Sequence, residues 1–357
     1  MNYKISTIKK TDSHSICKLY EEAFSQPMCK ADSQSIFLWF YFNNLYNKNY
    51  CMKLENGNEL LSYWGFIPLD CIIEGKILKG SLSFQLASKK EILGSTFLLW
   101  KKINKELISD NVALNFTINH ENSFLLLKKL GWTVINSPIL IKMLHPFLLI
   151  NDLIISKIKI KLIANFFNTI FLLLDYILSK FILFFEKKCE NVISVNSFSN
   201  NYNDIWIQMC KSIDYGVCLD YNYVNWRYKN KPNNNYRILS YISNGKVVGY
   251  LIYSVENDFG TSIGYIMDII VNPNNKIVID SLINYTKKEL FRKKVRIISA
   301  LSFNKNIFYH NFKSAGLKNL PNKLLPHKSY FSVFNNIINN NFEINQWHIS
   351  WGNHDNH

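Results

Sequence analysis

The chain of 357 residues contains one long internal repeat, and this repeat constrains the fold more than any other feature. A Trp-x-Tyr triplet, which starts at Trp39 in the first copy and at Trp226 in the second, precedes an Asn-Gly pair by 17 or 18 residues. The Asn-Gly pairs stand at 56–57 and at 244–245, between apolar, β-rich runs. This pattern predicts a β-hairpin with a two-residue turn in each copy.

The similarity continues beyond the hairpin with the same order of elements. Each copy next has a strand, a helical stretch, a short apolar strand, an asparagine, a helix and a glycine. We expect these first three elements at 77–86, 92–107 and 112–118 in the first copy and at 263–271, 277–293 and 297–303 in the second. Asn119 and Asn304 follow, each with a glycine 12 residues later. Each half thus reads β-β-α-β-α-β, which predicts an α/β (α+β) class with a mixed sheet and helices on its faces.

The repeat divides the chain into two modules. We expect an N-terminal module over 1–145, an apolar helical linker over 146–190, a C-terminal module over 191–335 and a terminal segment over 336–357. Two domains suit a chain of this length. Two tryptophans in the terminal segment, Trp347 and Trp351, favour its docking on the rest of the protein.

The linker is almost continuously apolar from Leu162 to Phe185. Its few polar residues recur at helical steps and predict one polar stripe opposite a wide apolar face. They are Asn165, Asn168, Asp175, Ser179 and Glu186. We expect a helix packed on both modules, because charges such as Asp175 are costly inside a bilayer. An interfacial membrane helix, preceded by Lys157, Lys159 and Lys161, or a true membrane span stays open as an alternative.

Charge and cysteine content limit the classes of partner and the cellular compartments that fit this chain. The net charge of +15 suits an anionic partner, although the abundance of Lys, Asn and Ile is also typical of an AT-rich genome. The seven cysteines form no CxxC pair and no zinc-binding spacing, and the first ten residues lack the apolar core of a secretory signal. We therefore expect no metal site, reduced thiols, and a protein in the cytoplasm or peripheral at the inner membrane face.

Short motifs in both halves carry a resemblance to a known family. In the first half they are Trp39-Phe40-Tyr41, Gly65-Phe66-Ile67-Pro68, Gly75-Lys76, 89–96, 119–123 and Leu130-Gly131-Trp132; in the second they are Asn225-Trp226-Arg227-Tyr228, 244–249, Met267-Asp268 and the ending 347–355. As a set, over nearly the whole chain outside the linker, they resemble tandem GNAT (Gcn5-related N-acetyltransferase) proteins of bacterial surface-polysaccharide and lipid modification. The resemblance implies an acyl-CoA-dependent N-acyltransferase that transfers an acyl group, acetyl by expectation, to an amine such as an amino sugar or amino acid.

In this family, a glycine-containing turn at a helix N-terminus binds the pyrophosphate of CoA, because glycine lets the backbone approach phosphate and the helix end favours negative charge. The residues that the resemblance assigns to acyl-CoA are Lys89, Lys90, Gly94, Ser95, Thr96 and, after the next strand, Asn119. Glu91 stands where the family has a basic or amide residue, and the preceding lysines offset its charge. The equivalent stretch of the second half, 272–277, has no glycine, so we expect acyl-CoA on the first module.

The reaction needs a general base that takes a proton from the attacking amine. Glu121 and His120, which follow the fifth strand, are the candidate catalytic residues, and Asp268 is a further candidate in the second half. The tyrosine that many GNAT enzymes use to protonate the leaving thiolate is missing from both halves, where Leu127 and Phe312 stand instead.

Two other functions stay open. One is a catalytically inactive tandem GNAT that binds a ligand or a partner, and the other is a Fem-type aminoacyl transferase that uses charged tRNA. The expected partners are a small-molecule amine or sugar acceptor, no nucleic acid other than charged tRNA, and peripheral membrane contact through 146–188.

Overall fold

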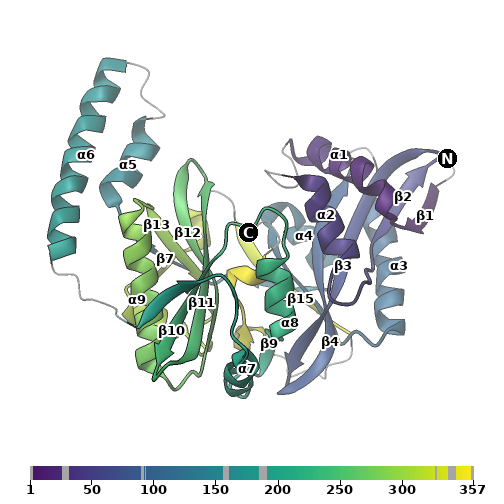
Figure 1. The fold of residues 1–357 in the computed structure, drawn as a ribbon. Coiled ribbons are helices and arrows are strands. Elements are labelled where there is room, and N and C mark those ends of the chain that lie inside the picture. The colour runs from purple at the N-terminus through teal and green to yellow at the C-terminus, as the bar shows by residue number, and fades with distance from the viewer. Residues whose placement is uncertain are drawn as a thin grey trace.

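A computed structural model describes residues 3–25, 32–89, 92, 94–155, 161–184, 191–325, 328–336 and 343–354. Its elements form two mixed sheets with helices on their faces, and a helical hairpin stands beside the second sheet (Figure 1). The mixed α/β architecture that the repeat predicts is confirmed.

The first sheet, sheet A, has nine strands within the described residues. They are, in spatial order, β1 (Tyr3–Thr7), β2 (Met52–Asn56), β3 (Glu59–Ile73), β4 (Lys76–Ser88), β5 (Leu114–His120), β15 (Ser329–Asn335) and β6 (Thr133–Asn136). β9 (Tyr215–Val217) also pairs with β3, and β16 (Trp347–His348) pairs with β9. β4 and β5 are parallel, whereas most other neighbours are antiparallel. η1 (Lys10–Asp12) leads into α1 (Ser13–Phe24), which packs with α2 (Ser33–Phe42) on one face. α3 (Ser95–Ser109) and α4 (Glu121–Lys129) cover the other face.

The second sheet, sheet B, has seven strands within the described residues. They are, in spatial order, β14 (Lys318–Asn319), β7 (Ile139–Met143), β13 (Ile297–Leu301), β12 (Thr261–Val271), β11 (Lys246–Asp258), β10 (Arg237–Ser243) and β8 (Val192–Val195). Its helices and short turns are α7 (Tyr202–Cys210), α8 (Tyr221–Val224), η2 (Asn225–Lys229), α9 (Lys276–Arg292), α10 (Tyr309–Ser314), η3 (Asn322–Leu324), η4 (Ile344–Gln346) and η5 (Trp351–Asn353). β12 and β13 are parallel, as β4 and β5 are in sheet A.

The two repeated hairpins turn in different ways. In the second copy, Asn244 and Gly245 are the turn residues, and both have positive φ, 48° and 73°, as a type I′ turn requires. In the first copy, the turn lies one residue later, at Gly57 and Asn58, and only Gly57 has positive φ, 61°. Glycine at the first turn position is typical of a type II′ turn, so the same sequence signal gives two turn geometries.

Two strands cross between the halves that the repeat defines. β7 is the last strand of the first module in sequence, yet it pairs with β13 and β14 in sheet B. In return, β15 is the last strand of the second module and lies between β5 and β6 in sheet A. The boundaries expected at 145 and 191 therefore divide the sequence, but each sheet is completed by a strand from the other half.

The repeated tryptophans meet at the centre of the molecule. Trp39 of α2 and Trp226 of η2 are buried and stack with ring centroids 4.7 Å apart. Phe40 packs edge-on against Trp226 at 5.7 Å and against Phe84 of β4 at 3.8 Å. Aromatic pairs of this kind add stabilisation beyond the area that they bury. The repeated tryptophans therefore pack the two modules against each other.

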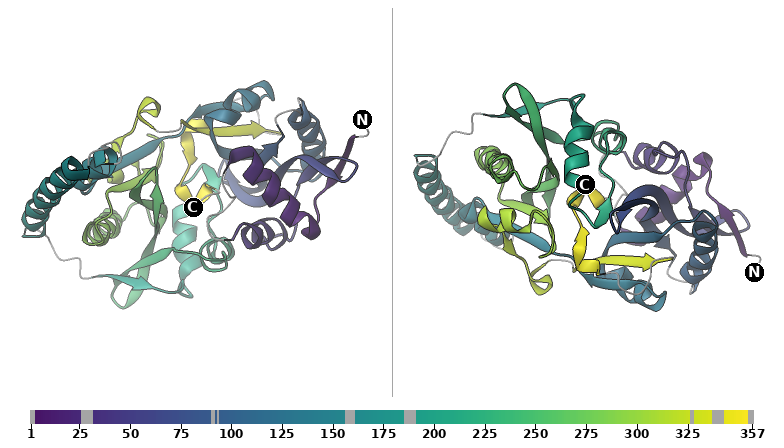
Figure 2. Two further views of the ribbon diagram at one scale, coloured as in Figure 1. Left: turned by 90° about the horizontal axis from the view of Figure 1, so that it is seen from above. Right: turned by 90° about the horizontal axis from the view of Figure 1, so that it is seen from below.

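The expected linker forms a helical hairpin of α5 (Pro146–Ile155) and α6 (Lys161–Phe184). Three views agree that it projects from sheet B on the side away from sheet A (Figures 1 and 2). Our expectation that this segment packs on both modules is therefore wrong. The reason is the strand exchange: α5 begins just after β7, so the hairpin stays with the sheet that β7 joins.

Candidate functional site

The parallel strands β4 and β5 separate toward their C-terminal ends. They pair only where Gly80–Leu82 faces Leu114–Phe116. Beyond Leu82, β4 continues to Ser88 with β3 as its one strand partner in the described part of the chain, so its other backbone edge is unpaired there. Register with β3 slips near Gln85, which has a φ of 44°. Such a bulge bends a strand and re-aims its backbone groups, and it is common beside active sites.

Helix α3 begins beside the end of β4. Gly94 is its N-cap, with a φ of 78° that favours glycine. Ser95 is buried, and its hydroxyl oxygen lies 2.8 Å from that of Ser88, which ties the helix to the strand. The N-cap makes no side-chain hydrogen bond, and the first turn has no acidic residue. The first N–H groups of α3 therefore lack helical and capping partners, and together with the helix dipole they favour an anion.

The predicted phosphate residues divide between these two features. Gly94, Ser95 and Thr96 lie at the start of α3, whereas Lys89 directly follows β4 and pairs with Glu59 at 2.5 Å. Lys90 lies outside the described residues. Asn119 lies near the end of β5, but its side-chain oxygen accepts a hydrogen bond from Ser332 of β15 at 2.6 Å. Asn119 therefore holds the exchanged strand in place.

The predicted catalytic residues follow β5 directly. His120 is the last residue of β5 and the N-cap of α4; it is exposed, and its ring centroid lies 6.2 Å from that of His354. Glu121 is the first residue of α4 and lies 3.9 Å from Lys328 in an exposed ion pair. A carboxylate in the first helical turn is also favoured by the helix dipole. Both residues stay predictions, at the end of the strand that diverges from β4.

The same divergence occurs in the second module, but there the chain's own terminal segment occupies it. β12 and β13 pair only over Ile263–Tyr265 and Ile297–Ser299. The indole N–H of Trp351 donates a hydrogen bond to Ser299 at 3.1 Å, and its ring packs edge-on against Tyr265 at 5.0 Å. The docking that we expected for the terminal segment is thus confirmed for its described part.

Gly352 allows the terminal segment to approach β12 closely. A Cβ atom at this position would overlap the hydroxyl of Tyr228 and the carboxylate of Asp268. Tyr228 donates a hydrogen bond to that carboxylate, which is buried. Asp268, expected as a possible general base, instead belongs to the packing that receives the terminal segment.

Arg227 clamps the same segment from η2. Its buried guanidinium donates to the carbonyl of Gly352 at 3.0 Å, to the carbonyl of His354 at 2.8 Å and to the hydroxyl of Tyr236 at 2.9 Å. Sequence reasoning gave Arg227 and Gly352 no such role, although both belong to the motifs that carry the resemblance. An arginine in an otherwise aromatic motif was the available signal.

Burial shifts the pKa of two titratable groups next to this segment. Burial raises the pKa of Asp268 to about 6, against the lowering effects of hydrogen bonds from Ser350 and Tyr228 and of the Arg227 charge. Burial lowers the pKa of His348 to about 4, so this histidine is neutral at pH 7. The Nδ1 atom of His348 lies 3.0 Å from the side-chain nitrogen of Asn306.

The helix that follows the divergence also differs in the second module. The side chain of Asn275 accepts a hydrogen bond from the backbone N–H of Val278 and so caps α9. α3, by contrast, begins at a glycine without a side-chain cap. An anion at α9 would have to compete with the asparagine side chain.

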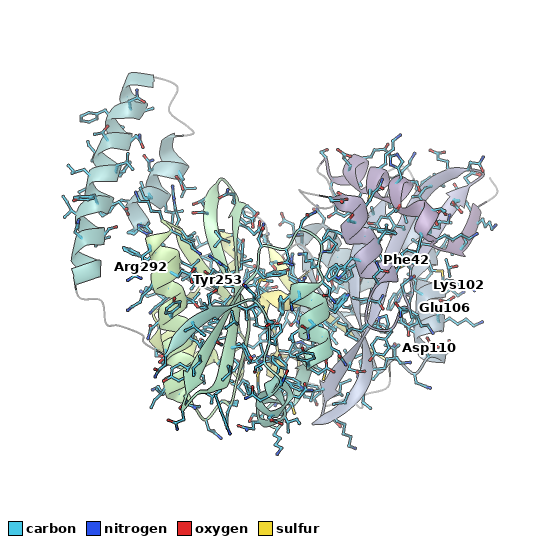
Figure 3. The ribbon with its side chains drawn as sticks, in the orientation of Figure 1. Phe42, Lys102, Glu106, Asp110, Tyr253 and Arg292 are labelled. Atoms are coloured by element: carbon cyan, nitrogen blue, oxygen red, sulfur yellow. The ribbon has the colours of Figure 1, made fainter. Side chains whose placement is uncertain are left out.

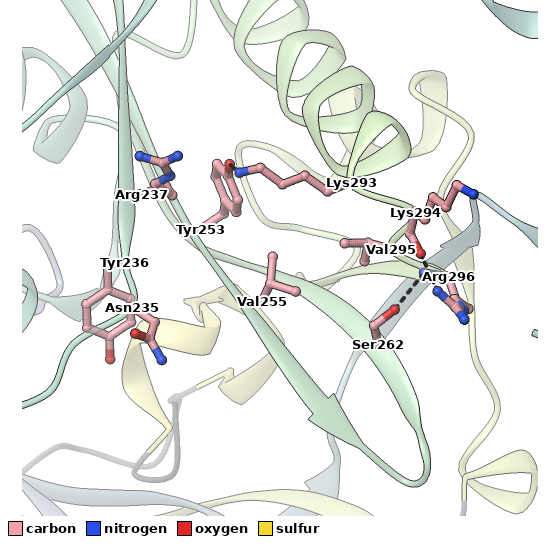
Figure 4. Close-up of a pocket in the computed structure, with 10 residues that line it drawn as sticks. All are labelled: Asn235, Tyr236, Arg237, Tyr253, Val255, Ser262, Lys293, Lys294, Val295 and Arg296. Carbon is pink, nitrogen blue, oxygen red and sulfur yellow. Dashed lines mark hydrogen bonds between the residues drawn. The ribbon is translucent and has the colours of Figure 1, made fainter. Parts of the chain in front are cut away.

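Two pockets lie away from the strand ends. One, of about 430 Å³, lies between the modules, where Ser35, Leu38, Trp39 and Asn43 of the α2 region face Asn230 and Pro232. The other, of about 530 Å³, lies on sheet B and is rich in basic side chains (Figure 4). Among the described residues, no group of three or more His, Cys, Asp or Glu side chains is placed to hold a metal ion.

The sequence matches no protein-family model, and no curated protein matches it. Solved structures do match over 93% of this chain. A probable N-acyltransferase from Enterococcus faecalis V583 has a TM-score of 0.57 at 13% identity, with 72% of its chain covered. A GCN5-related N-acetyltransferase from Anabaena variabilis has a TM-score of 0.56 at 10% identity, also with 72% covered. N-myristoyltransferase of Saccharomyces cerevisiae, solved with bound myristoyl-CoA, has a TM-score of 0.58 at 10% identity, with 78% covered. The chain therefore has the GNAT acyltransferase fold.

Proposed function

We propose that this protein is an N-acyltransferase that takes its acyl group from acyl-CoA bound to the first module. One observation carries the proposal: the two copies of the strand divergence differ. β4 leads to the uncapped N-terminus of α3 at Gly94, whereas Trp351 packs at the second divergence and Asn275 caps α9. Within the described residues, the first copy thus combines an unpaired strand edge with a helix end that has no side-chain cap.

In this proposal, each part of acyl-CoA meets a matching backbone group. The pyrophosphate accepts hydrogen bonds from the first N–H groups of α3, and Lys89 and Lys90 add positive charge. The amides of the pantetheine arm pair with the edge of β4 beyond Leu82, which has no strand partner there among the described residues. An N–H group at the bulge near Gln85 donates to the thioester oxygen, whose negative charge increases as the amine attacks.

The proposed acceptor is a primary amine, as in an amino sugar or an amino acid. Its nitrogen attacks the thioester carbon, the carbon–sulfur bond breaks, and CoA leaves as a thiolate that takes up a proton. His120 accepts the proton that the amine loses. The inter-module pocket beside Trp39 supplies amide, hydroxyl and aromatic groups of the kind that bind a sugar or an amino acid.

The acyl group is proposed to be acetyl, and a series of acyl-CoA molecules tests its length. The yeast structural neighbour was solved with myristoyl-CoA, so long chains belong in the series beside acetyl-CoA. If affinity rises steadily with acyl chain length, we would infer a long acyl group in place of acetyl. If all acyl-CoA molecules bind with equal affinity, acetyl-CoA stays the proposed donor.

The decisive experiment is calorimetric titration of acetyl-CoA and myristoyl-CoA into wild-type protein, Gly94→Asp and Gly94→Asn. Asp and Asn both tolerate positive φ and have nearly the same size, so the two variants differ mainly in charge. A carboxylate about 5 Å from the pyrophosphate would weaken binding by roughly 1–3 kcal/mol, about tenfold to a hundredfold. Gly94→Asn should bind more weakly than wild type, because an asparagine at the N-cap competes for the N–H groups of α3 as Asn275 does at α9. Gly94→Asp should bind more weakly still, and added salt should narrow the difference between the two variants.

Gly245→Asp is the matched control, because Gly245 also has positive φ, 73°, but lies in the second-module hairpin turn. It should leave the affinity unchanged. Equal acyl-CoA affinities of Gly94→Asp and Gly94→Asn would mean that the pyrophosphate does not bind at the N-terminus of α3. Absence of binding by wild type to any acyl-CoA would refute the whole proposal.

A further inference from the structure

The α5–α6 hairpin has its polar side facing the protein and its apolar side facing solvent. Asp175 of α6 is buried and contacts His145 at 2.9 Å, and the other ring nitrogen of His145 lies 2.8 Å from the carbonyl of Phe291 in α9. Asn168 accepts a hydrogen bond from Asn151 of α5 at 2.9 Å. The polar stripe seen in the sequence is therefore the surface that attaches α6 to α5 and to sheet B.

The opposite face of α6 is apolar and exposed. Phe166 is 62% exposed, and Leu173 and Ile177 are each 58% exposed. The stretch Ile163–Lys180 is apolar and long enough to cross a membrane, and only 11% of it is buried. Soluble proteins rarely expose a contiguous apolar surface of this kind, which marks a site of protein or membrane contact. The hairpin reverses the usual orientation of an amphipathic helix.

A cationic pocket lies at the end of sheet B that carries the hairpin. Arg237, Lys293, Lys294 and Arg296 line it, together with Tyr253 (Figure 4). The guanidinium of Arg296 donates to Asp152 of α5 at 2.9 Å, which joins the pocket to the base of the hairpin. Tyr253 and Arg292 mark this end of the sheet in Figure 3.

The pocket retains cationic groups that the fold does not neutralise. Lys293 pairs with Glu289 at 2.7 Å and donates to the hydroxyl of Tyr253 at 3.2 Å, and Arg296 pairs with Asp152. Across the described part of the chain, the side chains of Arg237 and Lys294 make no hydrogen bond or ion pair. Two charges thus stay available for an external anion on the sheet that carries the hairpin.

We propose that the hairpin docks on an anionic lipid membrane, with the apolar face of α6 in the headgroup and acyl boundary and lipid phosphate at the cationic pocket. An exposed apolar face next to positive charge fits an anionic bilayer surface. A second copy of this chain would bring the same cations to the interface. A membrane span would separate Asp175 from His145 and Asn168 from Asn151. Lys157 and Lys159, which the sequence places between the two helices, lie outside the described residues.

The first test is sedimentation of the full-length protein with vesicles of phosphatidylcholine alone and of phosphatidylcholine mixed with phosphatidylglycerol. The triple variant Phe166→Ser, Leu173→Ser and Ile177→Ser should lower partitioning on the order of a hundredfold, because three apolar side chains no longer enter the lipid. The matched control carries Ile108→Ser, Leu125→Ser and Ile277→Ser, which are 54%, 64% and 72% exposed on other helices. The control should partition as wild type does.

The second test removes the charges that have no partner. Arg237→Gln with Lys294→Gln should weaken binding to the mixed vesicles by about fivefold for each charge and should leave binding to phosphatidylcholine unchanged. The control is Lys211→Gln with Lys246→Gln, exposed lysines on other parts of the second module. Added salt should reduce the wild-type preference for anionic vesicles to the level of the charge variant.

Three results would overturn the proposal. Wild-type protein that stays in the supernatant with both vesicle types is one, and a triple variant that sediments as wild type does is another. The third is a wild-type dimer in analytical ultracentrifugation that the triple variant converts to monomer without any vesicle binding, which would assign the apolar face to a second copy. None of these measurements depends on acyl transfer.

Discussion

Arg227→Met should release the terminal segment from the second module. The methionine keeps much of the apolar length of arginine but removes the donors that hold the carbonyls of Gly352 and His354 and the hydroxyl of Tyr236. It also removes the positive charge near the buried carboxyl of Asp268. The carbonyls then either lose their partners or move to water, and the segment loses its anchor.

The cost follows from these contacts. A hydrogen bond to a charged group contributes about 1.5–3 kcal/mol, and removal of one partner from a buried charged network costs about 3–5 kcal/mol because the remaining polar groups stay desolvated. Release of the segment into water recovers part of this cost. We therefore expect the free energy of unfolding to fall by about 3 kcal/mol.

Urea unfolding followed by tryptophan fluorescence measures this change, since Trp347 and Trp351 lie in the segment. Gly352→Ala should have a similar effect by a different route, because the new methyl group would overlap Tyr228 and Asp268. If both changes act by releasing the same segment, the double variant should be little worse than either single variant. Limited proteolysis should cut the folded variants faster than the wild type within 343–354, because the released segment is no longer buried.

Two outcomes would refute this reasoning. An Arg227→Met variant within about 0.5 kcal/mol of wild type would mean that the guanidinium contributes no net stability. Additive effects of Arg227→Met and Gly352→Ala would mean that the two residues do not act through one docked segment.

Other changes have defined outcomes. His120→Gln should lower kcat about a hundredfold with little change in KM in acyl-transfer assays at saturating acyl-CoA, because it removes the proposed base, and a larger fall in Glu121→Gln would instead assign the proton transfer to Glu121. The pKa of Asp268 is raised from 3.8 to about 6, so this group makes the folded protein less stable as pH rises from about 4 to about 6. The pKa of His348 is lowered from 6.5 to about 4, so this group makes the folded protein less stable as pH falls from about 6.5 to about 4. Between about pH 4 and 6 the two slopes oppose each other, so urea titrations should show stability falling with decreasing pH in Asp268→Asn and rising in His348→Gln, by up to about 3 kcal/mol each. Trp39→Ala should cost about 3 kcal/mol in the same titrations, because it removes one ring of the stack between the modules.

The repeat predicted the fold class and most elements because it depends on local patterns. Alternating apolar residues and Asn-Gly pairs placed the hairpins, although the first turn lies at Gly57 and Asn58, one residue later than the pair itself. The exchange of β7 and β15 was not predictable in this way. A strand has the same apolar alternation whichever sheet accepts it, and the choice depends on which edge is free once both modules are assembled.

The candidate site was predictable only in part. Gly94 could be placed at a helix start because positive φ there favours glycine, a requirement visible in one residue. Its contact with acyl-CoA, like that of Asn119, stays a prediction. The bond of Asn119 to Ser332, more than 200 residues away in the chain, could not be predicted, because no local pattern reports such a partner. The packing around Asp268, a candidate general base, was also not predictable, because its neighbours Tyr228 and Gly352 come from distant segments of the chain.

The exchanged strands also decide how this protein can be divided. A fragment that ends before β15 leaves β5 and β6 without the strand between them, and a fragment that starts after β7 leaves an open edge on β13. Neither half is then a self-sufficient domain, although the sequence reads as two copies of one. If the chain is cut within the α5–α6 hairpin and the two fragments are made separately, the first lacks β15 in sheet A and the second lacks β7 in sheet B. Each fragment then carries the strand that the other needs. Such a pair is suited to reassembly as a split protein, in which the acyltransferase fold exists only when both fragments are present.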